Sequence, residues 1–426
     1  MHKKLMLATA MIFLFLVACQ PAVAPSPAAT QTGEGYKLPT LAPTSTSLPD
    51  ATPTEDLVLT AGEGCTVVTQ RDQPTPVSPF RAIDDSDWSV GPAEAAVTFI
   101  EYTDFQCPFC SQIFPVLEQL KQDFPDDLRL IFRHFPLPAH DKAIVAAHAA
   151  EAAGLQGEFW GMHDALFSKQ SEWVDMSEAD FRSWLADQAT ALALDLEQFN
   201  TDIDSEAVAQ RVQRDQDEST ALGLPGTPTL IINGQYYGGP NDLANLSAII
   251  SLIKLEKQQF TACPPLDIDA SHQYRATLKT EKGDIVIELY PDQAPIAVNN
   301  FIFLAQNHWY DGITFFRVIP DFVAQTGDPT NTGFGGPGYA FVNETSPDLT
   351  FDGPGVVGMA NAGPDSNGSQ FFITYSAQDK LNGGYTIFGH VVSGMDVLEQ
   401  LIPRNPATDP GAPPGDVLLS VTIEEK

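Results

Sequence analysis

The pattern of apolar and polar residues between positions 84 and 257 predicts strands and helices in mixed order. Residues 97–102 form an apolar run and residues 128–133 alternate, as strands do, while residues 111–124 between them have the periodicity of a helix. The pattern predicts further helices at residues 143–153, 160–167, 243–255 and from Ser177 onward, and a strand with an Asn-Gly hairpin within residues 226–234. We therefore expect the order β-α-β, a helical insertion and β-β-α.

A different pattern follows in residues 273–426. Alternating segments at residues 274–278 and 284–289 predict two strands, and a helix is predicted at residues 297–307. Short apolar segments with Gly and Pro turns come next, then a second helix at 395–401 and a closing strand at 417–423. Many short strands with two helices predict an all-β closed barrel with two capping helices. The chain is thus expected to be multidomain, an α/β domain followed by this barrel.

The first residues have the features of an export signal. His2, Lys3 and Lys4 precede an apolar run at residues 5–18, which is too short to span a bilayer comfortably and ends directly before Cys19. This order resembles a bacterial lipobox, in which the cysteine is lipidated and becomes the new N-terminus. The resemblance implies a lipid anchor on the extracytoplasmic side of the cell membrane, periplasmic or cell-surface. The alternative is a plain secretory signal with a chance cysteine.

The composition changes to Pro, Ala, Thr, Ser and Gly after Cys19. Such segments bury too little apolar surface to order themselves, so we expect a disordered tether. The predicted boundaries are 1–19 for the signal and lipobox, 20–83 for the tether, 84–262 for the first folded domain, 263–272 for a linker and 273–426 for the second folded domain.

The charge balance excludes some classes of partner. The formal net charge of the 426 residues is −33, which disfavours nucleic acid and anionic membrane surfaces, so the membrane is expected to be contacted through the lipid anchor only. The same acidity also fits a solvated surface with no function.

Cys107 and Cys110 have the spacing of a redox pair at the start of a predicted helix. The helix dipole favours the thiolate of the first cysteine, and the second can resolve a mixed disulfide. A C-x-x-C motif can also be half of a zinc site, but beyond Cys110 the only cysteine is Cys263. We therefore expect no metal and no cofactor, and catalytic roles for both cysteines.

Two further cysteines flank the first folded domain. In an oxidising compartment we expect Cys65 and Cys263 to form a structural disulfide that closes a long loop. An unpaired thiol used in exchange is the alternative.

The first folded domain resembles the DsbA-like thiol-disulfide oxidoreductases, which have a thioredoxin fold with a helical insertion. The motifs that carry the resemblance are TDFQCPFC at 103–110, FRHFPL at 132–137 and GTPT at 226–229. It implies that Pro228, after Thr227, is cis and faces the cysteines, where a substrate chain can lie. It also implies that Glu101 is buried beneath the site with a pKa raised toward neutrality, as general base work requires. A half-exposed glutamate at a strand end is the alternative for Glu101.

The second folded domain resembles the cyclophilin-type peptidyl-prolyl cis-trans isomerases over its whole length. The motifs are the long segments 315–328 and 358–373. The resemblance implies that Arg317 is catalytic, by hydrogen bonding to the prolyl nitrogen and weakening the amide resonance. It assigns the proline pocket to Phe322, Val323, Phe372 and Leu381, and the groove for the peptide backbone to Gln325, Ala360, Asn361 and Gln370.

Two positions depart from the family pattern. Lys380 stands where the family often has Trp, and Tyr385 where it often has His. The ring of Tyr385 can still wall the pocket, whereas Lys380 puts tight binding of cyclosporin-type ligands in doubt. A cyclophilin fold kept only for binding is the alternative.

Together these features predict a lipoprotein fusion that catalyses protein folding outside the cytoplasm. One domain would carry out thiol-disulfide exchange and the other prolyl isomerisation, both slow steps of folding. The expected partners are unfolded or folding exported proteins with X-Pro bonds and cysteines, and a redox partner that recycles the cysteine pair. A non-catalytic holdase and a dedicated thiol reductase are the alternatives.

Overall fold

The computed structural model describes residues 64–68, 78–409 and 412–426. The predicted signal, Cys19 and most of the predicted tether lie outside these residues. Within the described part of the chain, none of the helices combines the length and the apolar character that crossing a membrane requires.

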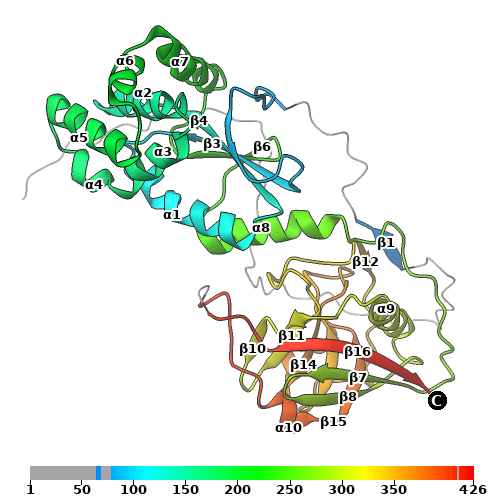
Figure 1. Ribbon diagram of the computed structural model, residues 1–426. Helices are drawn as coiled ribbons and strands as arrows, with labels where there is room; N and C mark the ends of the chain where they lie inside the picture. The colour runs from blue at the N-terminus through cyan, green and yellow to red at the C-terminus, as the bar shows by residue number, and fades with distance from the viewer. Residues whose placement is uncertain (1–63, 69–77, 410–411) are drawn as a thin grey trace, which may run out of the picture. The chain divides into compact units, whose positions relative to one another are not determined.

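The first domain is built on a five-stranded sheet with the order β2-β4-β3-β5-β6 (Figure 1). Its strands are β2 (Trp88–Val90), β3 (Val97–Thr103), β4 (Leu128–His134), β5 (Thr229–Ile232) and β6 (Gln235–Tyr237). The neighbours β3 and β4 run parallel and every other pair is antiparallel. The apolar runs that predicted β3 and β4 are explained by their burial, since six of the seven residues in each strand are buried.

Helices α1 (Pro108–Asp123) and α8 (Leu243–Glu256) pack together against this sheet. The insertion between β4 and β5 consists of α2 (Ala143–Gly154), α3 (Phe159–Ser168), α4 (Gln170–Trp173), α5 (Glu178–Ala191), α6 (Leu196–Asp202) and α7 (Glu206–Ala221). Ser177 caps α5 by accepting the N–H of Asp180 at 3.2 Å, as the sequence predicted.

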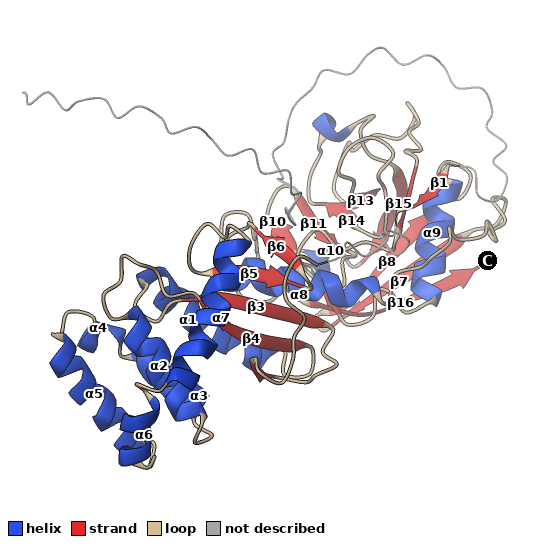
Figure 2. Ribbon diagram, turned by 90° about the horizontal axis from the view of Figure 1, so that it is seen from above, coloured by secondary structure: helices blue, strands red, loops and turns tan. Residues whose placement is uncertain are grey.

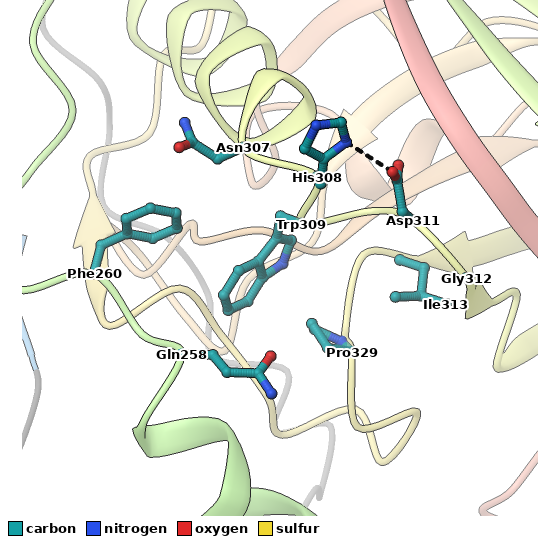
Figure 3. Close-up of a pocket in the computed structure, with 9 residues that line it drawn as sticks. All are labelled: Gln258, Phe260, Asn307, His308, Trp309, Asp311, Gly312, Ile313 and Pro329. Carbon is teal, nitrogen blue, oxygen red and sulfur yellow. Dashed lines mark hydrogen bonds and ion pairs between the residues drawn. The ribbon is translucent and has the colours of Figure 1, made fainter.

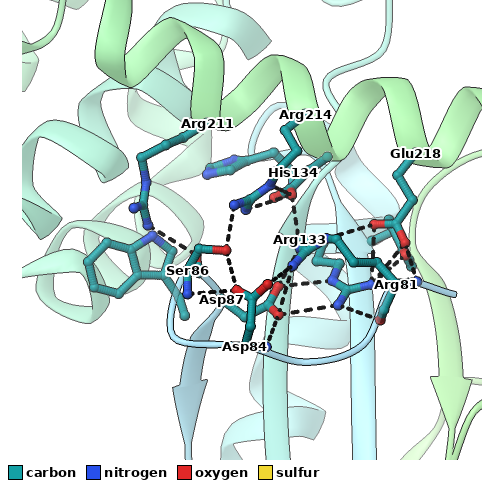
Figure 4. Close-up of polar contacts among 12 residues, drawn as sticks. Arg81, Asp84, Ser86, Asp87, Arg133, His134, Arg211, Arg214 and Glu218 are labelled. Carbon is teal, nitrogen blue, oxygen red and sulfur yellow. Dashed lines mark hydrogen bonds and ion pairs between the residues drawn. The ribbon is translucent and has the colours of Figure 1, made fainter.

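The FRHFPL motif supplies a buried charge network that holds the first residues of this domain (Figure 4). The Arg133 side chain is fully buried, and its guanidinium donates to Asp87, to Glu218 and to the carbonyl of Arg81. His134 lies 3.1 Å from Glu151. Each charge in this group faces an opposite partner, so removing any one of them would leave an uncompensated charge in the interior.

The second domain contains a nine-stranded sheet with the order β10-β11-β14-β13-β15-β8-β7-β16-β9. The strands are β7 (Tyr274–Thr280), β8 (Gly283–Leu289), β9 (Ile313–Thr314), β10 (Arg317–Ile319), β11 (Val323–Thr326), β13 (Val356–Met359), β14 (Phe371–Thr374), β15 (Ile387–Ser393) and β16 (Val417–Glu425). The helices are α9 (Pro295–Gln306), α10 (Met395–Leu398) and the 3-10 helix η2 (Asp379–Leu381). One core of buried aliphatic and aromatic side chains lies between the sheet and α9.

The predicted closed barrel is wrong in one respect, because the sheet curls but stays open (Figure 2). Its edge strands, β9 and β10, do not pair with each other. They are short, and only Phe315 and Phe316 separate them along the chain. The free edge of β10 pairs instead with a single residue, since Val318 and Arg404 exchange both backbone hydrogen bonds, at 2.7 and 2.8 Å. The sheet is thus a curled half-barrel.

Part of the predicted tether is a strand. Residues Cys65–Val67 form β1, which pairs with β12 (Tyr339–Phe341) in a two-stranded antiparallel sheet. This strand cannot be recognised from the sequence, because it has only three residues, they are mostly exposed, and the surrounding segment is rich in Pro and Thr. A disulfide joins Cys65 to Cys263, 198 positions later in the chain.

Candidate active sites

Cys107 occupies the junction between β3 and α1. It is the N-cap residue of α1, and Pro108 fills the first helical position, where no backbone N–H is needed. Both thiols are free, and Cys107 and Cys110 are 3% and 0% exposed. Phe109 between them is 64% exposed, so the motif presents an apolar ring to solvent above two buried sulfurs.

The pKa values of the two thiols are shifted in opposite directions. The hydrogen bond from Cys110 is the largest cause that lowers the pKa of Cys107, to about 5, and the backbone N–H groups of Phe109 and Cys110 act in the same direction. Burial raises the pKa of Cys110 well above its usual value, and the neighbouring Cys107 and Glu101 raise it further. The thiol of Cys107 is therefore the more readily ionised of the two, and Cys110 keeps its proton to higher pH.

Glu101 lies in β3 and is 2% exposed. Burial raises its pKa to about 7, and the charge of Cys107 contributes in the same direction. A carboxyl group with this pKa is half ionised near neutral pH, so it can both accept and return a proton. This burial does not fit the alternative that Glu101 is a half-exposed glutamate at the end of a strand.

The loop before β5 lies against the cysteine pair. The Sγ of Cys107 is 3.4 Å from the carbonyl oxygen of Thr227, and the peptide bond between Thr227 and Pro228 is cis. The structure thus brings Glu101, Cys107, Cys110, Thr227 and Pro228 into one site.

Arg317, the residue expected to catalyse isomerisation, begins a hydrogen-bonded row with two residues expected to line the backbone groove, Gln325 in β11 and Gln370 directly before β14. Arg317 in β10 donates from Nη1 to Oε1 of Gln325 in β11 at 3.1 Å, and Nε2 of Gln325 donates to Oε1 of Gln370 at 3.0 Å. Gln370 in turn donates to the carbonyls of Gly333 and Gly335 at 3.0 Å each. Burial lowers the pKa of Arg317, because its guanidinium is partly desolvated.

An apolar cluster lies beside this row. The guanidinium carbon of Arg317 is 5.5 Å from the ring centre of Phe322. The cluster includes every residue predicted for the proline pocket, namely Phe322, Val323, Phe372 and Leu381, together with Tyr385. Tyr385 packs edge-on against Phe372, with ring centres 5.6 Å apart. Sequence reasoning missed Phe351, which is fully buried and stacks on Phe372 at 5.5 Å, because it lies in a loop with no regular period.

The remaining groove residues lie at the end of β13. The N–H of Ala360 donates to the carbonyl of Gln370 at 2.9 Å. The Nδ2 of Asn361 donates to the carbonyl of Gly384 at 3.1 Å and is 3.5 Å from Oδ1 of Asn343. Lys380 is exposed in η2. Ala360 is thus joined to the end of the row through the backbone of Gln370, whereas the side chain of Asn361 bonds to Gly384 and to its Asn neighbours.

A pocket of about 270 Å³ is formed by residues of the second domain together with two residues that follow α8 (Figure 3). It is lined by Gln258, Phe260, Asn307, His308, Trp309, Asp311, Gly312, Ile313 and Pro329. Phe260 follows α8, and its N–H donates to the carbonyl of Pro337 at 2.8 Å. None of the residues predicted for catalysis or substrate binding lines this pocket.

Comparisons with known proteins find a matching family for each of the two domains. A family model described as cyclophilin type peptidyl-prolyl cis-trans isomerase/CLD matches residues 275–419, and one described as thioredoxin matches residues 84–251. The chain is 45% identical over 176 residues to peptidyl-prolyl cis-trans isomerase B of Streptomyces anulatus, which covers 37% of this chain and 99% of that protein.

A further relative is matched over a smaller share of its own length, and a solved structure is matched at lower identity. The chain is 41% identical over 180 residues to Na(+)/H(+) antiporter NhaA 1 of Mycolicibacterium gilvum, which covers 41% of this chain and 28% of that protein. A solved structure of a cyclophilin type peptidyl-prolyl cis-trans isomerase from Cryptosporidium parvum is 35% identical, has a TM-score of 0.33, and covers 36% of this chain and 99% of that chain.

Proposed function

Because the chain belongs to the cyclophilin-type peptidyl-prolyl cis-trans isomerase family and also contains a thioredoxin-like domain, we propose that it is a two-activity folding catalyst for exported proteins. The second domain isomerises X-Pro bonds, and the first exchanges thiols and disulfides. The observation that carries the proposal is the row from Arg317 through Gln325 to Gln370 beside the apolar cluster.

Isomerisation requires no nucleophile in this arrangement. Rotation about an X-Pro bond has a barrier of about 20 kcal/mol because the C–N bond is partly double. The apolar cluster around Phe372 holds the proline ring, and Gln325 holds the guanidinium of Arg317 toward it. A hydrogen bond from Arg317 to the prolyl nitrogen favours the pyramidal nitrogen of the transition state and so lowers the barrier.

Thiol-disulfide exchange proceeds in two balanced steps. The Cys107 thiolate attacks one sulfur of a substrate disulfide, which forms a mixed disulfide and releases the other substrate sulfur as a thiolate. Cys110 then loses its proton, with Glu101 as the acceptor, and attacks Sγ of Cys107. The second substrate thiolate leaves, and the Cys107–Cys110 disulfide remains, so the substrate is reduced and the pair is oxidised. The reverse sequence oxidises a substrate dithiol.

The isomerase activity is tested with Arg317→Ala on a proline-containing peptide. We expect kcat/KM to fall about 10²-fold, the loss that follows from removing one transition-state donor, while Arg182→Ala on the exposed face of α5 has no effect. Unchanged isomerisation by a folded Arg317→Ala protein would favour the holdase alternative.

The exchange activity is tested on a protein disulfide. We expect Cys107→Ser to abolish exchange, and Cys110→Ser to accumulate a mixed disulfide that is visible by mass spectrometry. The reduction potential of the pair decides the direction. A value near the −270 mV of thioredoxin would exclude a role in oxidising substrate dithiols and would favour the dedicated thiol reductase.

We propose a lipid anchor at Cys19 on the extracytoplasmic side of the membrane, supported by the charge, apolar run and cysteine at the start of the sequence. Metabolic labelling with a radioactive fatty acid should mark the wild type and not Cys19→Ala. Equal labelling of both proteins would exclude this anchor.

A further inference from the structure

The turn that leads from β3 into α1 is held by a loop that follows β4. Every residue from Glu101 to Cys107 is buried. The Asp104 carboxylate accepts the N–H of Gln106 and the N–H of Leu137, each at 2.8 Å, and its Oδ2 lies 2.6 Å from Nδ1 of His140. A carboxylate oxygen only accepts, so the ring nitrogen is the donor. One buried acid therefore links residues 104–106 to residues 137–140.

The same loop also holds the next side chain of the turn. The Oε1 of Gln106 accepts the N–H of Lys142 at 2.6 Å, and its Nε2 donates to Oδ1 of Asp141 at 2.8 Å. From α4, Nε2 of Gln170 donates to the carbonyls of Phe105 and Cys107, at 2.7 and 3.0 Å. The turn is thus fixed both by the loop after β4 and by the helical insertion.

Cys107 is at the end of this turn. Its N–H donates to the carbonyl of Asp104 at 3.0 Å, so a rotation of the Asp104 peptide moves the cysteine. The carbonyl of Thr227 lies 3.4 Å from Sγ, and the backbone N–H groups of Phe109 and Cys110 also act on it, so a displacement of a few tenths of an ångström changes these hydrogen bonds. The reactivity of the thiol therefore depends on how firmly the turn is held.

We propose that His140, acting through Asp104, is a positioning residue for thiol-disulfide exchange at Cys107. The inference rests on the proposed exchange activity of the first domain. The His140 ring donates to Asp104, Asp104 fixes the backbone of the turn, and the turn places the Cys107 sulfur against the start of α1. Without the ring, the buried carboxylate loses one of its donors and the turn loses one of its attachments to the loop.

The test compares four proteins by circular dichroism and by redox equilibrium with glutathione. These are wild type, His140→Ala, His140→Asn and the control His148→Ala, which removes a half-buried histidine whose Nδ1 lies 3.1 Å from the carbonyl of Ile203. We expect the disulfide of His140→Ala to be at least tenfold more stable than that of wild type, a potential about 30 mV lower. The Asn amide replaces Nδ1 as a donor, so His140→Asn should lie within threefold of wild type. His148→Ala should match wild type.

The thiolate absorbance of Cys107 provides a second measurement. Its titration midpoint should rise in His140→Ala and stay unchanged in His148→Ala. A folded His140→Ala protein with wild-type equilibrium and midpoint overturns the inference, and so does an equal shift in His148→Ala. The glutathione equilibrium needs no protein substrate. If the variants show the expected shifts but the protein does not act on protein disulfides, the proposed function fails and the positioning role of His140 stands. A wild-type pair that does not react with glutathione would defeat both.

Discussion

Arg317 and Gln325 are directly opposite each other in the antiparallel β10–β11 pair, and their side chains are joined by a hydrogen bond of 3.1 Å. This pairing orients a guanidinium whose water has been partly removed. A flexible arginine that is held by a neutral amide loses less freedom when the transition state forms. We therefore propose a second role for Gln325, the orientation of Arg317, besides the contact with the peptide backbone that the family resemblance implies.

We predict that Gln325→Ala lowers kcat/KM for isomerisation about tenfold, because a hydrogen bond to a charged group contributes about 1.5 kcal/mol. The measurement is a protease-coupled or NMR exchange assay. In the double variant with Arg317→Ala, the further loss should be smaller than tenfold, because the part of the effect that acts through the arginine is already gone and only the contact with the peptide backbone remains to be lost. Multiplicative losses in the double variant would contradict this role.

The Cys107 thiolate should be titratable by its absorbance near 240 nm, with a midpoint at about 5. Cys110→Ala should raise that midpoint by about one pH unit, because the hydrogen bond from Cys110 is the largest cause of the lowered pKa. Cys107→Ser should remove the signal. A midpoint that is unchanged in Cys110→Ala would show that the helix N-terminus dominates instead.

Glu101 should make the stability of the first domain depend on pH. Burial raises its folded pKa to about 7 from the model-compound value of 4.5, so its stabilising contribution is full below about 4.5 and is lost as the pH rises through about 7. In a Cys107→Ser background, where the thiolate does not titrate, Glu101→Gln should reduce the loss of unfolding free energy between about pH 5 and about pH 8 by about 2 kcal/mol. Parallel pH profiles for the two proteins would contradict the raised pKa.

The Cys65–Cys263 disulfide should stabilise the second domain. It closes a loop of 198 positions in sequence and attaches β1 to the strand β12. Replacing both cysteines by alanine should lower the unfolding free energy of the second domain by about 4 kcal/mol, with isomerase activity retained below the transition. Denaturant unfolding followed by the isomerase assay measures this loss. The matched control is the wild type after reduction, which should show the same loss.

Much of the fold could be predicted because its patterns are local. The helix with Ser177 as its cap and the strand β4 were both found from short stretches of sequence. Helix α7 was not predicted individually, because only Val208 and Val212 among its buried residues are apolar and Asp215 and Ser219 complete the buried face. The strand β1 was missed because its partner lies in the second domain, far away in the chain.

The candidate sites show the same division. The C-x-x-C spacing pointed to Cys107, and the resemblance of segment 315–328 to the cyclophilin family pointed to Arg317, because both signals depend on residue type and on near neighbours in the chain. The link from His140 to Asp104 depends on how a loop after β4 packs against a turn before α1, which no spacing along the sequence indicates. The bridge between Val318 and Arg404 at the edge of the half-barrel likewise joins residues far apart in the sequence.

The disulfide also decides what happens when the chain is cut. Both half-cystines lie outside the first domain, so any single cleavage between residues 66 and 262 leaves the two fragments covalently joined. A protease that cuts within the thioredoxin-like domain would therefore not separate the N-terminal segment from the cyclophilin-type domain, whereas a cut in the linker after Cys263 would. If Cys19 carries the proposed lipid anchor, this disulfide keeps the cyclophilin-type domain at the membrane even after the thioredoxin-like domain has been cut.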